Sequence, residues 1–311
     1  MNYKQCAKEL LSHDGILVLT HKNPDGDTAG SAAALCAALR RAGKKAYLFN
    51  NIQFVKKQLP YVEQYTAPDE FIPEYIVSVD ISTETLFPKG FEGQVDLCID
   101  HHGSNSHYAK LELVKPEKAA CGEIILEIIK NIHKSVTPEE ATLMYMAVST
   151  DTGCFRYANT NASTFRAASE LLASGADNSK INMEFFRKVS KNRLALEGLI
   201  YSELRTFRDG KICAVIISQR MLEESGVTDD DMDDIANLSG RVEGTVLNIT
   251  VREETDGTCK ISMRSTEEVN SSDICAVFGG GGHKMAAGCR ITGAPEKALE
   301  MLLNVIDEVW K

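Results

Sequence analysis

The chain has 311 residues, of which 43% are hydrophobic, so it is long enough to fold into two domains with separate cores. Charged residues make up 25% of it, and no apolar run approaches the roughly 20 residues of a membrane-spanning helix, which excludes a disordered chain and an integral membrane protein. The net charge of −10 makes long double-stranded nucleic acid an unexpected partner, because such binding depends on basic charge. The polar N-terminal segment and nine cysteines without a CxxC pair predict a cytoplasmic protein with reduced thiols.

The first half of the chain alternates short apolar runs with longer helical patterns, as in a parallel sheet covered by helices. Strands are predicted at 16–20, 44–50, 75–80 and 95–100, and helices at 28–41, 119–133, 138–150 and 161–174. This pattern predicts an α/β domain with a Rossmann-like parallel sheet over residues 1–182.

The second half has longer strand patterns, which predict a smaller α/β domain over residues 207–311, across a cleft from the first. An amphipathic stretch at 183–205 is predicted to form a helix in the linker 183–206. Strands are predicted at 211–218, 243–254 and 258–265, followed by a glycine-rich loop and a final helix from about residue 294. The KMAAG sequence after the glycines is interpreted as a helix start.

Acidic and histidine side chains follow the ends of several predicted elements in the first half. They are His21, Asp25, Asp27, Asp80, Asp100, His101, His102 and Asp151. Each has an alternative structural reading, since an aspartate can cap a helix or turn and a histidine can be satisfied in a core. Together they would meet at the carboxyl edge of the sheet, where mixed carboxylate and imidazole ligands suit Mn²⁺ and where several carboxylates would repel one another without cations. Two divalent ions are the natural solution.

The motifs that carry these residues resemble those of a known family. HxxPDGDTxGS, VSVDIS, DHHGSN and STDTGCFRY look like motifs I to IV of the DHH phosphoesterases, and FGGGGHKMAAGC looks like the GGGH motif of the accessory DHHA1 domain. At this length the chain is most similar to the stand-alone nano-RNase and pAp phosphatase branch. The two expected domains are then a DHH domain and a DHHA1 domain.

The resemblance implies roles for the individual residues. One Mn²⁺ would be held by His21, Asp25 and Asp80, and the other by Asp27, Asp80, His101 and Asp151, with Asp80 as the bridge. His102 would face the scissile phosphate, and Asp100 would orient the histidine pair. Cys154 departs from the small residue, often serine, that the family usually has, and it is interpreted as a small packed hydrophobe or, alternatively, as a source of oxidation sensitivity.

The second domain is expected to hold the substrate. Candidate binding residues are Arg264, Arg241, Gly280, Gly281, Gly282 and His283. Bare amides of the glycine run would bind an anion and Arg264 would add a charge-assisted contact. The glycines can equally be a flexible hinge, and Arg241 can equally be a surface residue.

The ligand chemistry and the family resemblance together imply a Mn²⁺-dependent phosphoesterase with two ions per chain, for which Mg²⁺ or Co²⁺ would substitute. Its expected substrates are short RNA oligonucleotides, including pApA-type dinucleotides, and 3′-phosphoadenosine 5′-phosphate (pAp), with no membrane partner and with a homodimer as one allowed state. The alternatives are a cyclic-di-AMP phosphodiesterase of the same family and a non-catalytic nucleotide-binding module. A family II pyrophosphatase ranks lower, and a dehydrogenase is excluded by the lack of GxGxxG after the first strand.

Overall fold

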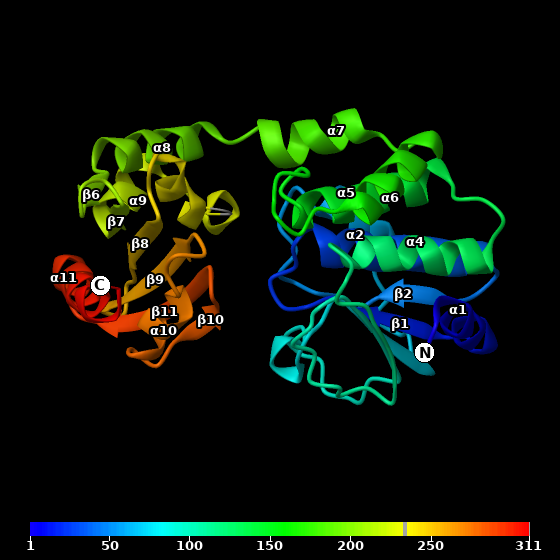
Figure 1. The fold of residues 1–311 in the computed structure, drawn as a ribbon. Coiled ribbons are helices and arrows are strands. Elements are labelled where there is room, and N and C mark those ends of the chain that lie inside the picture. The colour runs from blue at the N-terminus through cyan, green and yellow to red at the C-terminus, as the bar shows by residue number, and fades with distance from the viewer. Residues whose placement is uncertain (233–234, 311) are drawn as a thin grey trace. The chain divides into compact units, whose positions relative to one another are not determined.

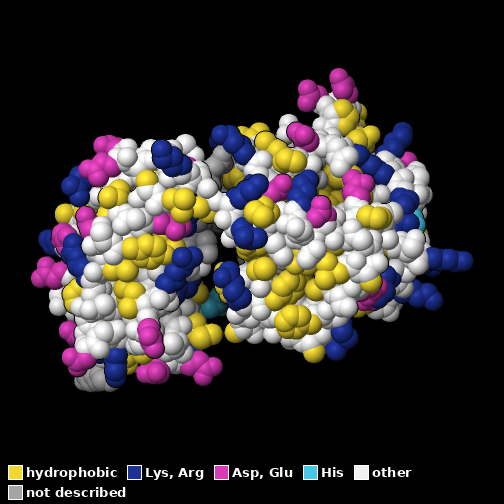
Figure 2. Space-filling model, turned by 90° about the horizontal axis from the view of Figure 1, so that it is seen from above, with side chains coloured by type: hydrophobic (Ala, Val, Ile, Leu, Met, Phe, Trp, Pro, Cys, Tyr) yellow, Lys and Arg dark blue, Asp and Glu magenta, His cyan; other side chains and the backbone are white. Residues whose placement is uncertain are grey.

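The computed structural model describes residues 1–232 and 235–310 (Figure 1). The chain divides into two compact units, Met1–Lys188 and Val189–Lys311. Acidic and basic side chains both occur on the visible face of each unit (Figure 2). Over the part of the chain that is described, no helix combines the length and the apolar character needed to cross a bilayer.

The first unit is built on a five-stranded parallel sheet in the order β2-β1-β3-β4-β5. Its strands are β1 (Ile16–Leu19), β2 (Ala46–Leu48), β3 (Tyr75–Val79), β4 (Leu97–Asp100) and β5 (Leu111–Val114). The first four confirm the predicted strands. The edge strand β5 was not predicted, because only one of its four residues, Leu113, is fully buried and its sequence lacks a continuous apolar run.

Helices cover this sheet. They are α1 (Tyr3–Ser12), α2 (Gly26–Arg41), α3 (Leu59–Val62), α4 (Cys121–Ile132), α5 (Pro138–Asp151), α6 (Ala162–Ala173) and α7 (Asn178–Asn182). The four helices expected here, α2, α4, α5 and α6, are confirmed to within about two residues, whereas α1, α3 and α7 were not predicted. Helix α5 begins with the capping box of Thr137 and Glu140, whose side chains and backbone amides bond reciprocally.

Helix α2 lies at the centre of the first unit because its small side chains allow close packing. A Cβ on Gly30 would lie 2.3 Å from the carbonyl oxygen of Leu143 in α5, so only glycine permits this approach of the two helices. Leu35 and Leu39 of α2 are fully buried, and each contributes about 1.5–3 kcal/mol by leaving water. The helix therefore holds its N-terminus, with Asp25 and Asp27, firmly at the edge of the sheet.

The second unit contains a six-stranded sheet in the order β10-β11-β9-β8-β7-β6. Its strands are β6 (Arg205–Phe207), β7 (Ile212–Ile217), β8 (Leu247–Glu253), β9 (Thr258–Ser265), β10 (Gly281–His283) and β11 (Ala286–Thr292). Its helices are α8 (Lys191–Ser202), α9 (Gln219–Ser225), α10 (Ser271–Ala276) and α11 (Pro295–Val309). Only β7 and β8 are parallel neighbours. The apolar face of the sheet packs against α10 and α11.

Two predicted elements of the linker and second unit are wrong. The stretch 183–205 is not one helix: a π-helical turn, Met183–Arg187, ends at the extended Lys188, and α8 begins after Ser190, whose hydroxyl accepts from the amide of Arg193. The local N-cap outweighs the continuous amphipathic pattern.

The glycine run does not open a helix either. Gly281 pairs with Gly288 in the β10–β11 hairpin, and Ala287, Cys289 and Ile291 alternate into the core as a strand requires. The strand expected at 243–254 also begins only at Leu247.

Candidate metal centre

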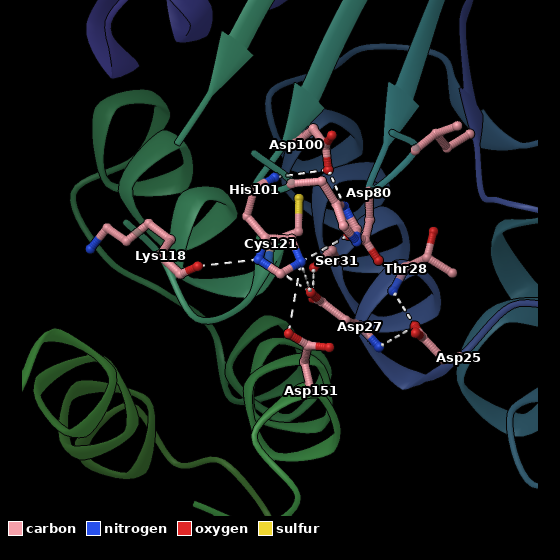
Figure 3. A network of polar contacts seen from close by, with 12 residues as sticks. Asp25, Asp27, Thr28, Ser31, Asp80, Asp100, His101, Lys118, Cys121 and Asp151 are labelled. Carbon is pink, nitrogen blue, oxygen red and sulfur yellow. Dashed lines mark hydrogen bonds and ion pairs between the residues drawn. The ribbon is translucent and has the colours of Figure 1, made fainter. Parts of the chain in front are cut away.

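The acidic and histidine side chains predicted from the sequence meet at the carboxyl edge of the five-stranded sheet (Figure 3). Three overlapping groups have one potential ligand atom per residue, all within 4.8 Å of one another. These groups are His21, Asp25 and Asp80; Asp27, His101 and Asp151; and Asp80, His101 and His102. Asp80 belongs to two groups and so lies between them.

Asp80 reaches this position through an unusual backbone conformation. It follows β3 directly and has φ of 62°, a left-handed value that costs a non-glycine residue about 1–3 kcal/mol. Its Oδ1 lies 3.3 Å from Nε2 of His101, and its Oδ2 lies 3.8 Å from Nε2 of His21. The strained turn therefore aims one carboxylate at both imidazoles.

Asp27 is fixed by the N-terminus of α4. Its Oδ2 accepts from the amide of Cys121 at 2.6 Å, and its Oδ1 accepts from the amide of Gly122 at 3.0 Å and from the hydroxyl of Ser31 at 2.9 Å. A helix N-terminus stabilises a negative charge. Asp27 is thus a buried, oriented carboxylate (Figure 3).

Asp25 caps a helix and also lies beside a histidine of the cluster. Its Oδ1 caps α2 by accepting from the amides of Asp27 and Thr28, at 2.9 and 3.0 Å. The same oxygen lies 3.6 Å from Nε2 of His21. The predicted helix cap is therefore present, and it holds the carboxylate beside the histidine.

Two of the histidines are oriented by backbone carbonyls. Nδ1 of His21 is 2.8 Å from the carbonyl of Lys22, and Nδ1 of His101 is 3.1 Å from the carbonyl of Lys118. A carbonyl can only accept, so in the neutral form of both rings Nδ1 carries the proton and Nε2 keeps its lone pair. That tautomer is the one in which Nε2 can bind a metal ion.

Buried polar atoms at the centre of the cluster have no hydrogen-bond partner among the described residues. They include Oδ1 of Asp80 and Nε2 of His101. Burial raises the pKa of Asp151 to about 7, an effect to which Asp80 adds and which His101 opposes. Oxygen and nitrogen atoms without a hydrogen-bond partner, beside closely spaced carboxylates, fit a divalent cation. The cation would coordinate these atoms and neutralise the charge of the carboxylates.

His102 differs from the other two histidines because its partner is a carboxylate. Its Nδ1 lies 2.8 Å from Oδ1 of Asp100, which is fully buried. The Nδ2 of Asn105 donates to the other oxygen of Asp100 at 2.6 Å. The sequence analysis assigned no role to Asn105, although its place in DHHGSN was the available signal.

The predicted binding residues of the second unit lie in different places. Arg264, Gly280 and Gly281 line one hollow of about 670 Å³ on the sheet. Gly282 and His283 are exposed in β10 and do not line it, and Arg241 donates to the hydroxyl of Tyr201 instead.

A row of cations on the same sheet was missed by the sequence analysis. The register places Arg252 of β8 and Arg290 of β11 directly opposite Lys260 of β9. Lys260 and Arg290 line the 670 Å³ hollow, and Arg252 and Lys260 line a neighbouring hollow of about 290 Å³. Strand pairing was needed to find the row, because the three residues are far apart in the sequence.

Cys154 lies in a left-handed turn after α5, with φ of 58°. Its Sγ is partly exposed and lies 3.8 Å from Oδ1 of Asn182.

Comparison with known proteins matches both halves of the chain to family models. Residues 15–148 match the N-terminal domain of the DHH family, and residues 209–311 match the DHHA1 domain. A protein of Thermus thermophilus named bifunctional oligoribonuclease and PAP phosphatase NrnA is 34% identical, with 94% of this chain and 89% of that protein covered. The protein of the same name from Bacillus subtilis is 26% identical, with 90% of each covered.

Solved structures show the same fold. An exopolyphosphatase-related protein from Bacteroides fragilis has a TM-score of 0.88 at 22% identity, covering 98% of this chain and 96% of that one. RecJ from Thermus thermophilus, solved with Mn²⁺, has a TM-score of 0.56 at 14% identity, covering 99% of this chain and 54% of that one. The two family-model matches and the identity to the Thermus thermophilus protein agree, and the chain belongs to the DHH family, with a DHHA1 domain as its second half.

Proposed function

We propose that this protein is a Mn²⁺-dependent phosphoesterase that hydrolyses short oligoribonucleotides and pAp. The observation that carries the proposal is Asp80, whose carboxylate lies 3.8 Å from Nε2 of His21 and 3.3 Å from Nε2 of His101 and so joins the two proposed ligand sets. The names of the relatives from Thermus thermophilus and Bacillus subtilis support the choice of substrates, since the chain matches nearly the whole length of both.

The ligand chemistry favours two divalent ions. His21, Asp25 and Asp80 would hold one ion, and Asp27, Asp80, His101 and Asp151 would hold the other. Carboxylates mixed with imidazoles suit Mn²⁺. Divalent ions, when bound, lower the pKa of water and neutralise charge on a phosphoryl group.

His102 is the proposed proton donor to the phosphate. Because Asp100 accepts from its Nδ1–H, Nε2 is the atom that remains to face a substrate oxygen. Burial alone would lower the pKa of His102. The hydrogen bond to Asp100 and the negative charges of Asp80 and Asp100 together outweigh burial and raise that pKa, which favours the charged, donating ring. Asn105 holds Asp100 in place and so acts as a positioning residue.

The cation row Arg252–Lys260–Arg290 is the proposed anchor for a substrate phosphate, together with Arg264. Like charges directly opposite one another on a sheet destabilise it, so three adjacent cations favour an anionic ligand. Partial desolvation and the charges of Arg252 and Arg290 lower the pKa of Lys260, and the charge of Glu254, which pairs with Arg252 at 2.7 Å, only partly opposes them. A phosphate bound across the row would relieve this repulsion.

A cyclic-di-AMP phosphodiesterase remains the second candidate. A protein of that name from Geobacillus thermodenitrificans is 25% identical over 92% of this chain, but the match covers only 46% of that protein. The NrnA relatives match along nearly their full length and therefore favour the first candidate.

The deciding experiment compares kcat/KM for pAp, pApA, a 5-mer RNA, pGpG, cyclic-di-AMP and pyrophosphate in the presence of Mn²⁺. The proposal predicts the highest values for pAp and the short RNAs. A preference for cyclic-di-AMP would establish the second candidate, and no turnover of any substrate would favour a non-catalytic binding module.

A second experiment separates the anchor from the metal centre. Arg264→Ala should lose about 10- to 150-fold in kcat/KM for pAp, the worth of a charge-assisted contact, while its turnover of a chromogenic phosphodiester is retained. Arg220→Ala is the matched control, because Arg220 is an exposed arginine of α9 whose ion pairs are with the surface residues Glu203 and Glu224. Equal losses on both substrates would contradict the anchor role.

A further inference from the structure

The most completely bonded carboxylate near the metal centre belongs to a residue with no part in the proposed ligand set. Glu123 lies in the first turn of α4 and is 1% exposed. Its Oε1 accepts from the amide of Ala119 at 3.1 Å and from the hydroxyl of Thr164 at 2.9 Å. Its Oε2 accepts from the ammonium of Lys118 at 3.1 Å and from the hydroxyl of Ser163 at 2.8 Å.

These four contacts fix the turn 118–122 that enters α4. Two come from the turn itself and two from the N-terminus of α6, so the carboxylate ties the turn to a second helix. The residue before α4, Ala120, supplies no capping side chain. Asp27 accepts from the amides of Cys121 and Gly122, and Glu123 holds the preceding residues Lys118 and Ala119, so both carboxylates order the entry to the helix. A buried carboxylate with four donors is held in one geometry.

The same turn holds two proposed metal ligands by its backbone. The carbonyl of Lys118 accepts from Nδ1 of His101, and the amides of Cys121 and Gly122 donate to the two oxygens of Asp27 (Figure 3). The ring of His101 and the carboxylate of Asp27 therefore depend on where this turn lies.

We propose that Glu123 is a positioning residue for the ion held by Asp27, His101 and Asp151. This inference rests on the proposed function. Glu123 acts through the turn and touches neither the ion nor the substrate. Groups that orient metal ligands in this way are typically worth 10- to 100-fold in metal affinity.

The test measures Mn²⁺ binding to the purified, EDTA-treated protein by calorimetric titration. Glu123→Gln keeps the shape of the side chain but replaces one acceptor by an amide that faces Lys118 and Ser163. We expect one of the two Mn²⁺ sites of this variant, the site that contains Asp27, to lose 10- to 100-fold in affinity. At saturating Mn²⁺ its KM for pAp should equal that of the unsubstituted protein, because the anchor is untouched.

Two further variants keep the result interpretable. Glu127→Gln, one turn along the same helix in a surface pair with Lys130, removes an equal charge and should leave Mn²⁺ affinity unchanged. Ser163→Ala removes a single donor to Glu123 and should lose about 2- to 10-fold in affinity, and it serves as the readout if Glu123→Gln does not fold.

The outcomes distinguish this inference from the proposed function. Unchanged Mn²⁺ affinity in Glu123→Gln, or in Ser163→Ala where Glu123→Gln does not fold, would overturn the positioning role. An equal loss of Mn²⁺ affinity in Glu127→Gln would also overturn the positioning role. If the unsubstituted protein bound no Mn²⁺, the proposed function itself would fail, and this inference with it.

Discussion

Asp80 is a single residue whose carboxylate lies beside both proposed ligand sets. Its left-handed backbone and its position after β3 place the carboxylate between His21 and His101. The sequence was enough to select Asp80, because it ends a predicted strand, but not to show the strained turn that aims it. Positive φ at an aspartate has no dependable sequence signal.

Substituting Asp80 should therefore impair both ions. We expect Asp80→Asn to reduce the number of Mn²⁺ ions bound per chain and to abolish turnover of pAp. Metal analysis after gel filtration checks this directly. A variant that keeps two tightly bound ions and a near-normal rate would show that Asp80 is not a bridge.

His102 should behave differently, because its Nδ1 is engaged by Asp100. We expect His102→Ala to retain its metal ions and to lose about 10²–10⁴-fold in kcat, the usual worth of a positioned proton donor. The measurement is single-turnover hydrolysis of pAp together with metal analysis. Loss of the metal ions in this variant would make His102 a ligand instead.

The metal-free protein should lose stability as pH rises. The pKa of Asp151 is raised from 3.8 to about 7, and that of His21, where Asp25 and Asp80 outweigh the opposing effect of burial, from 6.5 to about 9. Between each ordinary value and the raised value the folded state holds more protons than the unfolded state, so stability falls with rising pH in both windows.

The melting temperature in EDTA should thus fall steadily from pH 5 to pH 8. Excess Mn²⁺ should reverse the trend, because metal binding requires deprotonated ligands and strengthens with pH. A melting temperature in EDTA that rises over this range would contradict the raised pKa values of Asp151 and His21.

At the scale of elements, regular patterns predicted the fold well and local contacts decided the exceptions. The buried strands β1, β3 and β4 and the capped helix α5 have unambiguous sequence signals. The break between Arg187 and Lys191 depends on one serine cap inside an otherwise helical pattern.

The glycine run was misread because glycine fits both a helix start and a tight hairpin. Its place in the fold follows from close contact with β11. A Cβ on Gly280 would lie 2.2 Å from the carbonyl oxygen of Gly288 and 2.4 Å from Cβ of Cys289, whereas a Cβ on Gly281 would meet nothing within 4 Å.

Two alanine substitutions test this difference. Gly280→Ala should destabilise the second unit by about 1–3 kcal/mol, since the added methyl group forces the run away from β11. Gly281→Ala is the matched control and should unfold at a denaturant concentration close to that of the unsubstituted protein. If both variants were equally stable, the run would be a flexible loop.

At the scale of the whole molecule, the proposed metal ligands and the proposed substrate anchor belong to different units of one chain. The metal cluster was predictable because each of its residues follows an element end that the parallel sheet brings to one edge. The cation row was not predictable from the sequence, because the antiparallel register of β8, β9 and β11 brings together residues that no local pattern connects. Arg241 and His283, chosen from motifs alone, lie outside both hollows.

The most direct test of the central proposal is a stoichiometric Mn²⁺ titration of the EDTA-treated protein, with pAp hydrolysis measured at each point. The account predicts no hydrolysis without metal and a rate that reaches its maximum only as the second ion per chain binds, because the carboxylate of Asp80 lies beside His21 of one proposed ligand set and His101 of the other. Full activity in EDTA, or a maximum rate at one ion per chain, would contradict it.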